Sequence, residues 1–99
     1  MQADLIIVGA GMVGSTLALA LQDSGLSIML VDGGPLDVHP FKASDPFEPR
    51  VSALSAASQR ILQRVGAWEG IVSRRASPYL DMHVWDGSGT GQIDFSAAA

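Results

Sequence analysis

Two short apolar runs stand out in the first part of the chain. Leu5–Val8 and Ile28–Val31 are continuous in apolar, largely β-branched side chains, which predicts two buried strands. Between them, residues 15–21 are small or apolar and predict a helix. Parallel strands need such a crossover connection, so the pattern predicts a βαβ unit and an α/β fold.

A glycine-rich turn leads from the first strand into this helix, with the sequence Gly9-Ala10-Gly11-Met12-Val13-Gly14. The first glycine permits a tight turn, and the second lets a pyrophosphate approach the backbone where no Cβ intervenes. The third, Gly14, allows close packing on the sheet. A helix that begins at Gly14 directs its free N–H groups and positive dipole end toward the phosphates.

Asp32 directly follows the second strand, near the spacing of about 20 residues expected for the acid that binds a ribose hydroxyl. Ala18 and Leu21 fall on the packing face of the helix, and Gly25 lies where a C-cap glycine would end it. The alternative is a plain βαβ unit with a glycine turn and no ligand. The complete strand–turn–helix–strand–acid context favours a dinucleotide-binding unit.

Residues 33–49 change abruptly in composition. Four of the five prolines lie here, which excludes a helix or a central strand and predicts a long surface connection. Arg50 ends this stretch, and an arginine in this place is either a solvated charge or a phosphate contact beside the N-terminus of the next helix. The chemistry of the residue alone leaves both interpretations open.

Apolar residues then recur at helical spacing from Leu54 to Val65, with Ser52 as the expected N-cap and Gly66 as the expected C′ glycine. A short helical turn over residues 67–72 follows. Arg74 and Arg75 come after it, where cations interact favourably with a helix C-terminus.

From Tyr79 onward the apolar period changes to two, on both sides of a glycine-rich turn at residues 86–91, which predicts an antiparallel hairpin. No helix is expected after this turn, so it is interpreted as a flexible turn rather than a second phosphate loop. Asp81 and His83 share a face, but two side chains do not make a metal site, and none is assigned.

Composition narrows the function further. The chain has six Lys and Arg against ten Asp and Glu, so no basic surface is expected for binding nucleic acid. The chain has no cysteine, its start lacks the positive region of a signal peptide, and its apolar runs are too short to cross a membrane. We therefore expect a cytoplasmic location, with peripheral contact at the inner membrane as an open alternative.

A dinucleotide-binding domain normally has five or six strands, and the 99 residues supply two parallel ones. The chain is therefore interpreted as the N-terminal part of a longer protein. Residues 1–78 would belong to the cofactor-binding domain, and residues 79–99 would begin a truncated substrate-domain hairpin. Unpaired strand edges predict that the isolated chain self-associates or is partly unfolded. Because it holds only the ADP half of the cofactor site, it is expected to bind FAD weakly at best and to lack hydroxylase activity.

Four segments together carry a family resemblance: the glycine turn, residues 48–55, residues 62–68 and residues 82–86. The chain resembles the flavin-dependent aromatic hydroxylases of ubiquinone biosynthesis, with a Rossmann-like FAD-binding domain of the p-hydroxybenzoate hydroxylase type. Residues 73–77 look closest to the 2-octaprenylphenol hydroxylase branch.

The resemblance implies FAD rather than NAD as the bound dinucleotide, with NAD(P)H and O2 as co-substrates and a prenylated phenol as the molecule hydroxylated. It implies that Arg50 approaches the FAD phosphates. Peripheral contact, either with a membrane or with other ubiquinone-biosynthesis proteins, is an open expectation for the parent protein. The family usually has Glu where Asp32 stands; the shorter acid still suits a ribose hydroxyl and disfavours a 2′-phosphate. No catalytic residue is named. Another FAD-dependent oxidoreductase, or a free-standing nucleotide-binding module, remains the alternative.

Overall fold

Two parallel strands and the helix between them form the first unit of the structure. In the computed structural model, which describes residues 2–97, strand β1 (Leu5–Val8) pairs in parallel with strand β2 (Ile28–Val31). Helix α1 (Met12–Ala20) connects them and packs on both. The predicted strands are confirmed. The helix begins at Met12 rather than at Gly14, because Gly11 is its extended N-cap residue.

One face of this two-stranded sheet is covered and the other is open. Ile7 points toward α1 and is 7% exposed, whereas Ile6 and Val8 on the opposite face are 56% and 85% exposed. Parallel sheets are normally covered on both faces. Residues 2–97 cover only one face. The open apolar face offers a surface for the self-association predicted for the isolated chain, which stays a prediction.

The C-terminal end of α1 differs from the expectation. The helix ends at Ala20 with Leu21 as its C-cap, so Gly25 is not the C-cap glycine. Instead the chain continues through a turn in which the Ser24 hydroxyl donates to the Leu21 carbonyl at 2.6 Å. Gly25 then adopts φ +80° and redirects the backbone toward β2.

Helices α2 (Ala56–Arg64) and α3 (Trp68–Val72) form a packed pair. Gly66, with φ +81°, ends α2 in a Schellman motif: its N–H donates to Gln63, and the next N–H donates to Leu62. This confirms the C′ prediction. The N-cap prediction was wrong, because Ser55 rather than Ser52 accepts the hydrogen bond from the Ser58 N–H.

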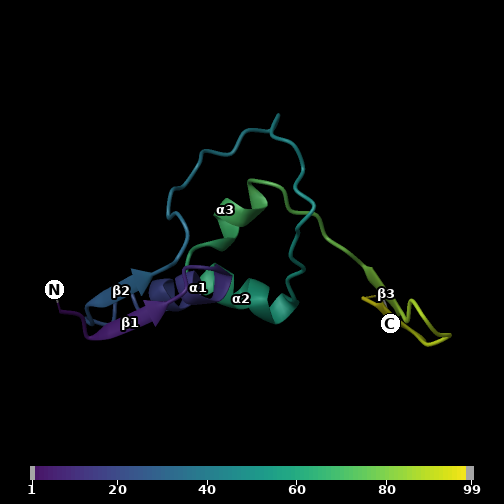
Figure 1. Ribbon diagram of the computed structural model, residues 1–99, viewed down its shortest axis with the longest axis horizontal. Coiled ribbons are helices and arrows are strands. Elements are labelled where there is room, and N and C mark those ends of the chain that lie inside the picture. Colours follow the sequence, from purple (N-terminus) through teal and green to yellow (C-terminus); the bar gives the residue numbers. More distant parts are fainter. Residues whose placement is uncertain (1, 98–99) are drawn as a thin grey trace.

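An irregular segment of residues 33–55 links β2 to α2. It has no helix or strand, as the prolines predicted for residues 33–49. In Figure 1 it rises from the end of β2, passes above α1 and α3, and returns to the start of α2. We call residues 33–55 the arch.

The last elements form the predicted antiparallel hairpin. Strands β3 (Asp81–Trp85) and β4 (Gln92–Ser96) pair with Met82 opposite Phe95 and Val84 opposite Ile93. All residues of both strands are exposed, and Figure 1 shows the hairpin extending away from the other elements. The structure thus confirms a small α/β arrangement with a parallel pair, helices and a hairpin.

Among residues 2–97, no helix has the length and apolar character that a membrane crossing requires.

Candidate nucleotide-binding site

Backbone contacts shape the glycine turn and require glycine at two of its positions. Gly9 has φ +107°, and its N–H donates to the Val31 carbonyl at 2.6 Å, which ties the turn to the end of β2. A Cβ added to Gly14 would lie 1.9 Å from the Gly9 carbonyl oxygen and 3.3 Å from the Ile7 side chain. Helix α1 therefore starts closer to the turn than any side chain at position 14 would permit.

Gly11 has a different environment. A Cβ at this position would have no heavy atom within 4 Å, so the local packing does not require glycine here. Gly11 is also the N-cap of α1, whose N-terminus has no side-chain cap and no acidic residue in its first turn. The helix N-terminus thus combines free backbone donors, positive dipole and open space, which together suit an anion.

Asp32 links the ends of the two strands. Its Oδ1 accepts a hydrogen bond from the Ala10 N–H at 2.9 Å, and its Oδ2 accepts one from the Gly34 N–H at 3.0 Å. These two bonds, with the Ala10 bond the larger cause, lower the pKa of Asp32 below its usual value. The carboxylate is therefore charged near neutral pH. A carboxylate accepts about four hydrogen bonds, so capacity remains for a ligand hydroxyl.

Ser15 also supports the turn, and sequence reasoning did not single it out. Its hydroxyl donates to the Ala10 carbonyl at 3.0 Å, so both polar groups of the Ala10 backbone have partners. A hydroxyl residue one position after the third glycine is the signal that could have identified it.

The side chains of Met12 and Val13 face a different surface. They line an apolar groove of about 400 Å³ between α1 and α2, together with Thr16, Leu17, Leu54 and Ile61. These two residues can therefore contribute to an anion site through their backbone N–H groups, while their side chains belong to the groove.

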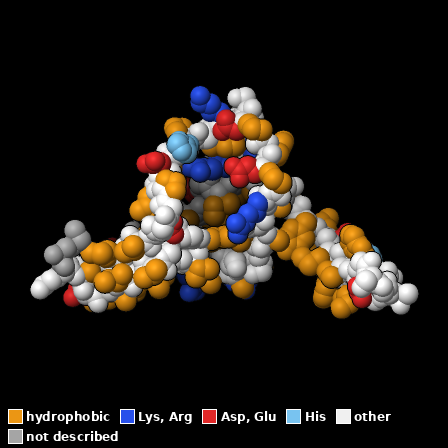
Figure 2. Space-filling view, viewed as in Figure 1, with side chains coloured by type: hydrophobic (Ala, Val, Ile, Leu, Met, Phe, Trp, Pro, Cys, Tyr) orange, Lys and Arg blue, Asp and Glu red, His pale blue; other side chains and the backbone are white. Residues whose placement is uncertain are grey.

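Arg50 lies apart from the glycine turn in the described residues. It lines a hollow of about 620 Å³ under the arch, with Phe47, Glu48 and Arg75 among its neighbours, and no residue of the turn lines that hollow. Charged side chains of both signs surround the opening under the arch in Figure 2. Helix α2 begins only at Ala56, so Arg50 is not beside its N-terminus, contrary to the sequence prediction. Its phosphate contact stays a prediction.

The hairpin holds a polar pair outside this site. The His83 Nδ1 contacts the Asp94 Oδ1 directly across the two strands, and the His83 ring stacks on Trp85 with centroids 5.4 Å apart. The cross-strand contact therefore pairs His83 with Asp94 rather than with Asp81. Within residues 2–97, no group of three or more His, Cys, Asp or Glu is arranged to hold a metal ion.

The sequence is similar to several known proteins. No protein-family model matches the chain. It is 35% identical over 95 residues to the 3-demethoxyubiquinol 3-hydroxylase of Escherichia coli, covering 96% of this chain and 24% of that protein. It is 40% identical over 85 residues to the ubiquinone hydroxylase UbiL of Rhodospirillum rubrum, covering 86% of this chain and 19% of that protein.

A eukaryotic protein gives a similar match. The ubiquinone biosynthesis monooxygenase COQ6 of Danio rerio is 36% identical over 96 residues, covering 93% of this chain and 20% of that protein. The chain thus spans about a fifth to a quarter of the length of the curated relatives it matches. Its homologues are hydroxylases and monooxygenases of ubiquinone biosynthesis, which confirms the resemblance found in its motifs.

Proposed function

We propose that this chain binds the ADP part of FAD and that the whole protein is an FAD-dependent monooxygenase of ubiquinone biosynthesis. In this proposal it hydroxylates a prenylated phenol with NAD(P)H and O2. One observation carries the proposal: the Asp32 carboxylate and the uncapped start of α1 lie at the same end of the parallel pair, joined through the Ala10 N–H. The functions of the relatives supply the ubiquinone context.

The described residues fit an ADP group in three respects. The backbone N–H groups at Met12 and Val13 have no side-chain cap and suit the pyrophosphate. The missing Cβ of Gly11 leaves room for the pyrophosphate to approach. The free lone pairs of Asp32 suit a ribose hydroxyl, and its negative charge disfavours the 2′-phosphate of NADP.

Bound FAD would supply the redox chemistry and the activation of oxygen, while the protein supplies binding and orientation. Residues 9–14 and Asp32 hold one end of the cofactor in this proposal, and Arg50 adds a phosphate contact. No acid or base among residues 2–97 is assigned to the hydroxylation itself. We expect the isolated chain to bind FAD weakly and to be inactive.

Cofactor identification on the whole protein tests the proposal. The purified protein is denatured, and the released cofactor is identified by chromatography and mass spectrometry. NAD(P)H oxidation is then followed with and without a prenylated phenol, and the product is analysed for an added oxygen. We expect FAD and substrate-dependent formation of a hydroxylated phenol.

The other outcomes separate the alternatives. Bound FAD without hydroxylation of any prenylated phenol would indicate another FAD-dependent oxidoreductase. Binding of a nucleotide without any redox turnover would indicate a nucleotide-binding module. Absence of any bound nucleotide, with no affinity for added FAD, would contradict the proposal.

A further inference from the structure

Arg75 makes the most extensive side-chain contacts of any residue under the arch. Its Nη1 donates to the Pro46 carbonyl at 3.1 Å, and its Nη2 donates to the carbonyls of Ala43, at 2.9 Å, and Asp45. These partners lie about thirty residues earlier in the chain. Residues 43–46 of the arch are therefore fastened to the segment that follows α3.

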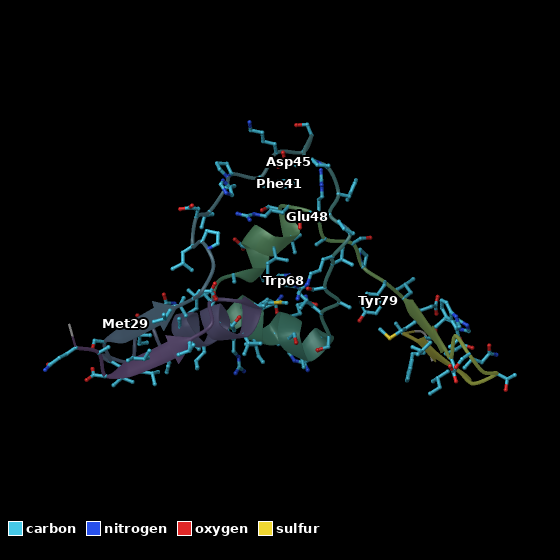
Figure 3. All side chains as sticks on the ribbon, in the orientation of Figure 1. Met29, Phe41, Asp45, Glu48, Trp68 and Tyr79 are labelled. Carbon is cyan, nitrogen blue, oxygen red and sulfur yellow. The ribbon has the colours of Figure 1, made fainter. Side chains whose placement is uncertain are left out.

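Two aromatic rings of the arch contact the same guanidinium. Its central carbon lies 4.1 Å from the Phe47 ring centroid and 5.2 Å from the Phe41 ring centroid. Both distances fall within the range of cation–π attraction. Figure 3 shows Phe41 and Asp45 at the crest of the arch, above the end of α3. A planar group with five donors can bond several carbonyls while its face stacks on rings, whereas lysine has three donors and no planar face.

The crest of the arch is shaped to meet this cation. The Asp45 N–H donates to the Lys42 carbonyl at 2.9 Å, and the Lys42 N–H donates to the Asp45 Oδ2 at 3.0 Å. This reciprocal pair closes a turn at residues 42–45. The carbonyls of Ala43, Asp45 and Pro46 converge on Arg75 instead of being left to solvent.

Arg50 shares the hollow that Arg75 anchors. Phe47, Glu48, Arg50 and Arg75 all line it. The charge of Arg75 is taken up by three carbonyl oxygens and two rings, whereas no hydrogen bond or ion pair of the Arg50 guanidinium is present within residues 2–97. Arg50 is thus the uncommitted cation of the hollow, four residues after the anchored Pro46.

We propose that Arg75 is a positioning residue: it fixes the crest of the arch and thereby sets the place from which Arg50 reaches the cofactor phosphates. The second half of this statement rests on the proposed function, since it assumes that Arg50 contacts FAD. The first half concerns only the fold of the arch, and the two can be measured separately.

Limited trypsinolysis of the whole protein without cofactor tests the first half. Trypsin cleaves after Lys42, within the anchored turn, and mass spectrometry follows that cut alone. We expect Arg75→Ala to accelerate it by roughly tenfold or more, because local opening exposes the bond. Arg75→Lys keeps the charge but not the planar fork of donors. Its rate of cleavage is expected to lie between those of the unmodified protein and Arg75→Ala. Arg74→Ala removes a neighbouring charge whose side chain makes no such contact, and is expected to leave the rate unchanged.

Flavin titration of the same variants tests the second half. We expect Arg75→Ala to weaken FAD binding by about tenfold, a loss of the size of one charge-assisted hydrogen bond. Added to Arg50→Ala, it should cause little further loss, because both changes remove the same contact. Melting temperatures of all variants identify any that fail to fold, and Arg75→Lys then carries the test.

Each result decides one part. Unchanged cleavage after Lys42 in a folded Arg75→Ala variant would overturn the anchoring role. Faster cleavage with unchanged FAD affinity would overturn the positioning of Arg50. Unchanged FAD affinity in Arg50→Ala would contradict the phosphate contact of the proposed function, while the cleavage result would still stand for Arg75.

Discussion

The chain contains two glycine-rich turns that each follow a strand and contact an aspartate, yet their geometry differs. In the first, Asp32 reaches from the end of β2 to the Ala10 N–H in the glycine turn, and the turn opens into α1. In the second, Asp86 folds onto its own turn and accepts from both the N–H and the hydroxyl of Ser88. The pKa of each aspartate is lowered, by Ala10 and Gly34 in one case and by Ser88 in the other.

The difference shows what distinguishes a ligand site from a closed turn. The hairpin aspartate makes both of its side-chain hydrogen bonds within its own turn, and Gly89 lies so close that an added Cβ would be 2.7 Å from the Asp86 Oδ2. The first turn leaves open space at Gly11 and an uncapped helix start. Glycine content alone therefore does not identify a phosphate-binding turn. The distinguishing feature is the helix that follows the turn.

The largest expected effect is at Gly14. Gly14→Ala places a Cβ 1.9 Å from a backbone carbonyl that cannot move aside, so the turn must open. We expect a loss of about 3 kcal/mol in stability, the upper range for overpacking, together with loss of flavin. Thermal melting and the flavin content of the purified protein measure both.

Gly89→Ala is the matched control, because the closest atoms to its Cβ belong to the Asp86 side chain, whose carboxylate can rotate. We expect a change below about 1 kcal/mol and normal flavin content. Equal destabilisation by the two substitutions would contradict the close packing described for the first turn.

The next effect concerns Arg50. Arg50→Ala in the whole protein is expected to weaken FAD binding by about 1.5–3 kcal/mol, the range for a hydrogen bond to a charged group. Little change in melting temperature is expected, since Arg50 is exposed. Arg60→Ala on α2 removes the same charge away from the hollow and serves as the control in a flavin titration. Equal affinities of the two variants would assign Arg50 to solvent.

A smaller effect separates the two aspartates. Asp32→Asn keeps an acceptor but removes the charge, and is expected to weaken FAD binding by about tenfold. Asp86→Asn, at a turn that no helix follows, is expected to leave FAD affinity unchanged. Fluorescence titration of both variants measures the difference. A loss of affinity in Asp86→Asn equal to that in Asp32→Asn would remove the distinction between the turns.

The smallest effect is on acid stability. The lowered pKa of Asp32 and of Asp86 means that each carboxylate stabilises the folded state above its unfolded pKa of about 3.9. This contribution is lost as the pH falls through the lower pKa of the folded state. Either Asn variant should therefore lose less stability than the parent below about pH 4, measured by circular dichroism. An unchanged acid profile in both variants would contradict these hydrogen bonds.

Much of the first unit was predictable from sequence because its determinants are local. Continuous apolar runs gave the bounds of β1 and β2, and a change of period gave the hairpin. Helix ends were less predictable. Ser52 and Ser55 lie three positions apart and are equally suited to the N-cap by residue type. The backbone stays non-helical up to Ser55, so Ser55 is the N-cap.

The contacts of the arch could not be predicted. Arg75 was expected near the C-terminus of α3, whereas its guanidinium binds carbonyls about thirty residues away. Backbone carbonyls carry no sequence identity, so no residue pattern reports their convergence. The open face of the sheet was equally unpredictable: the continuous apolar run of β1 predicts burial on both faces of a parallel sheet, but not which residues cover each face.

The most direct test of the central claim compares Gly11 with Gly87, since a Cβ at either position would have no heavy atom within 4 Å. The Cβ of either valine would therefore meet no protein atom, and melting temperatures show the capping cost of valine at the start of α1 separately from the loss of a ligand. The measurement is the flavin content and melting temperature of the two purified variants. We predict that Gly11→Val folds without flavin and that Gly87→Val retains its full yellow colour. A Gly11→Val protein with full flavin occupancy would contradict the assignment of the glycine turn as the cofactor site.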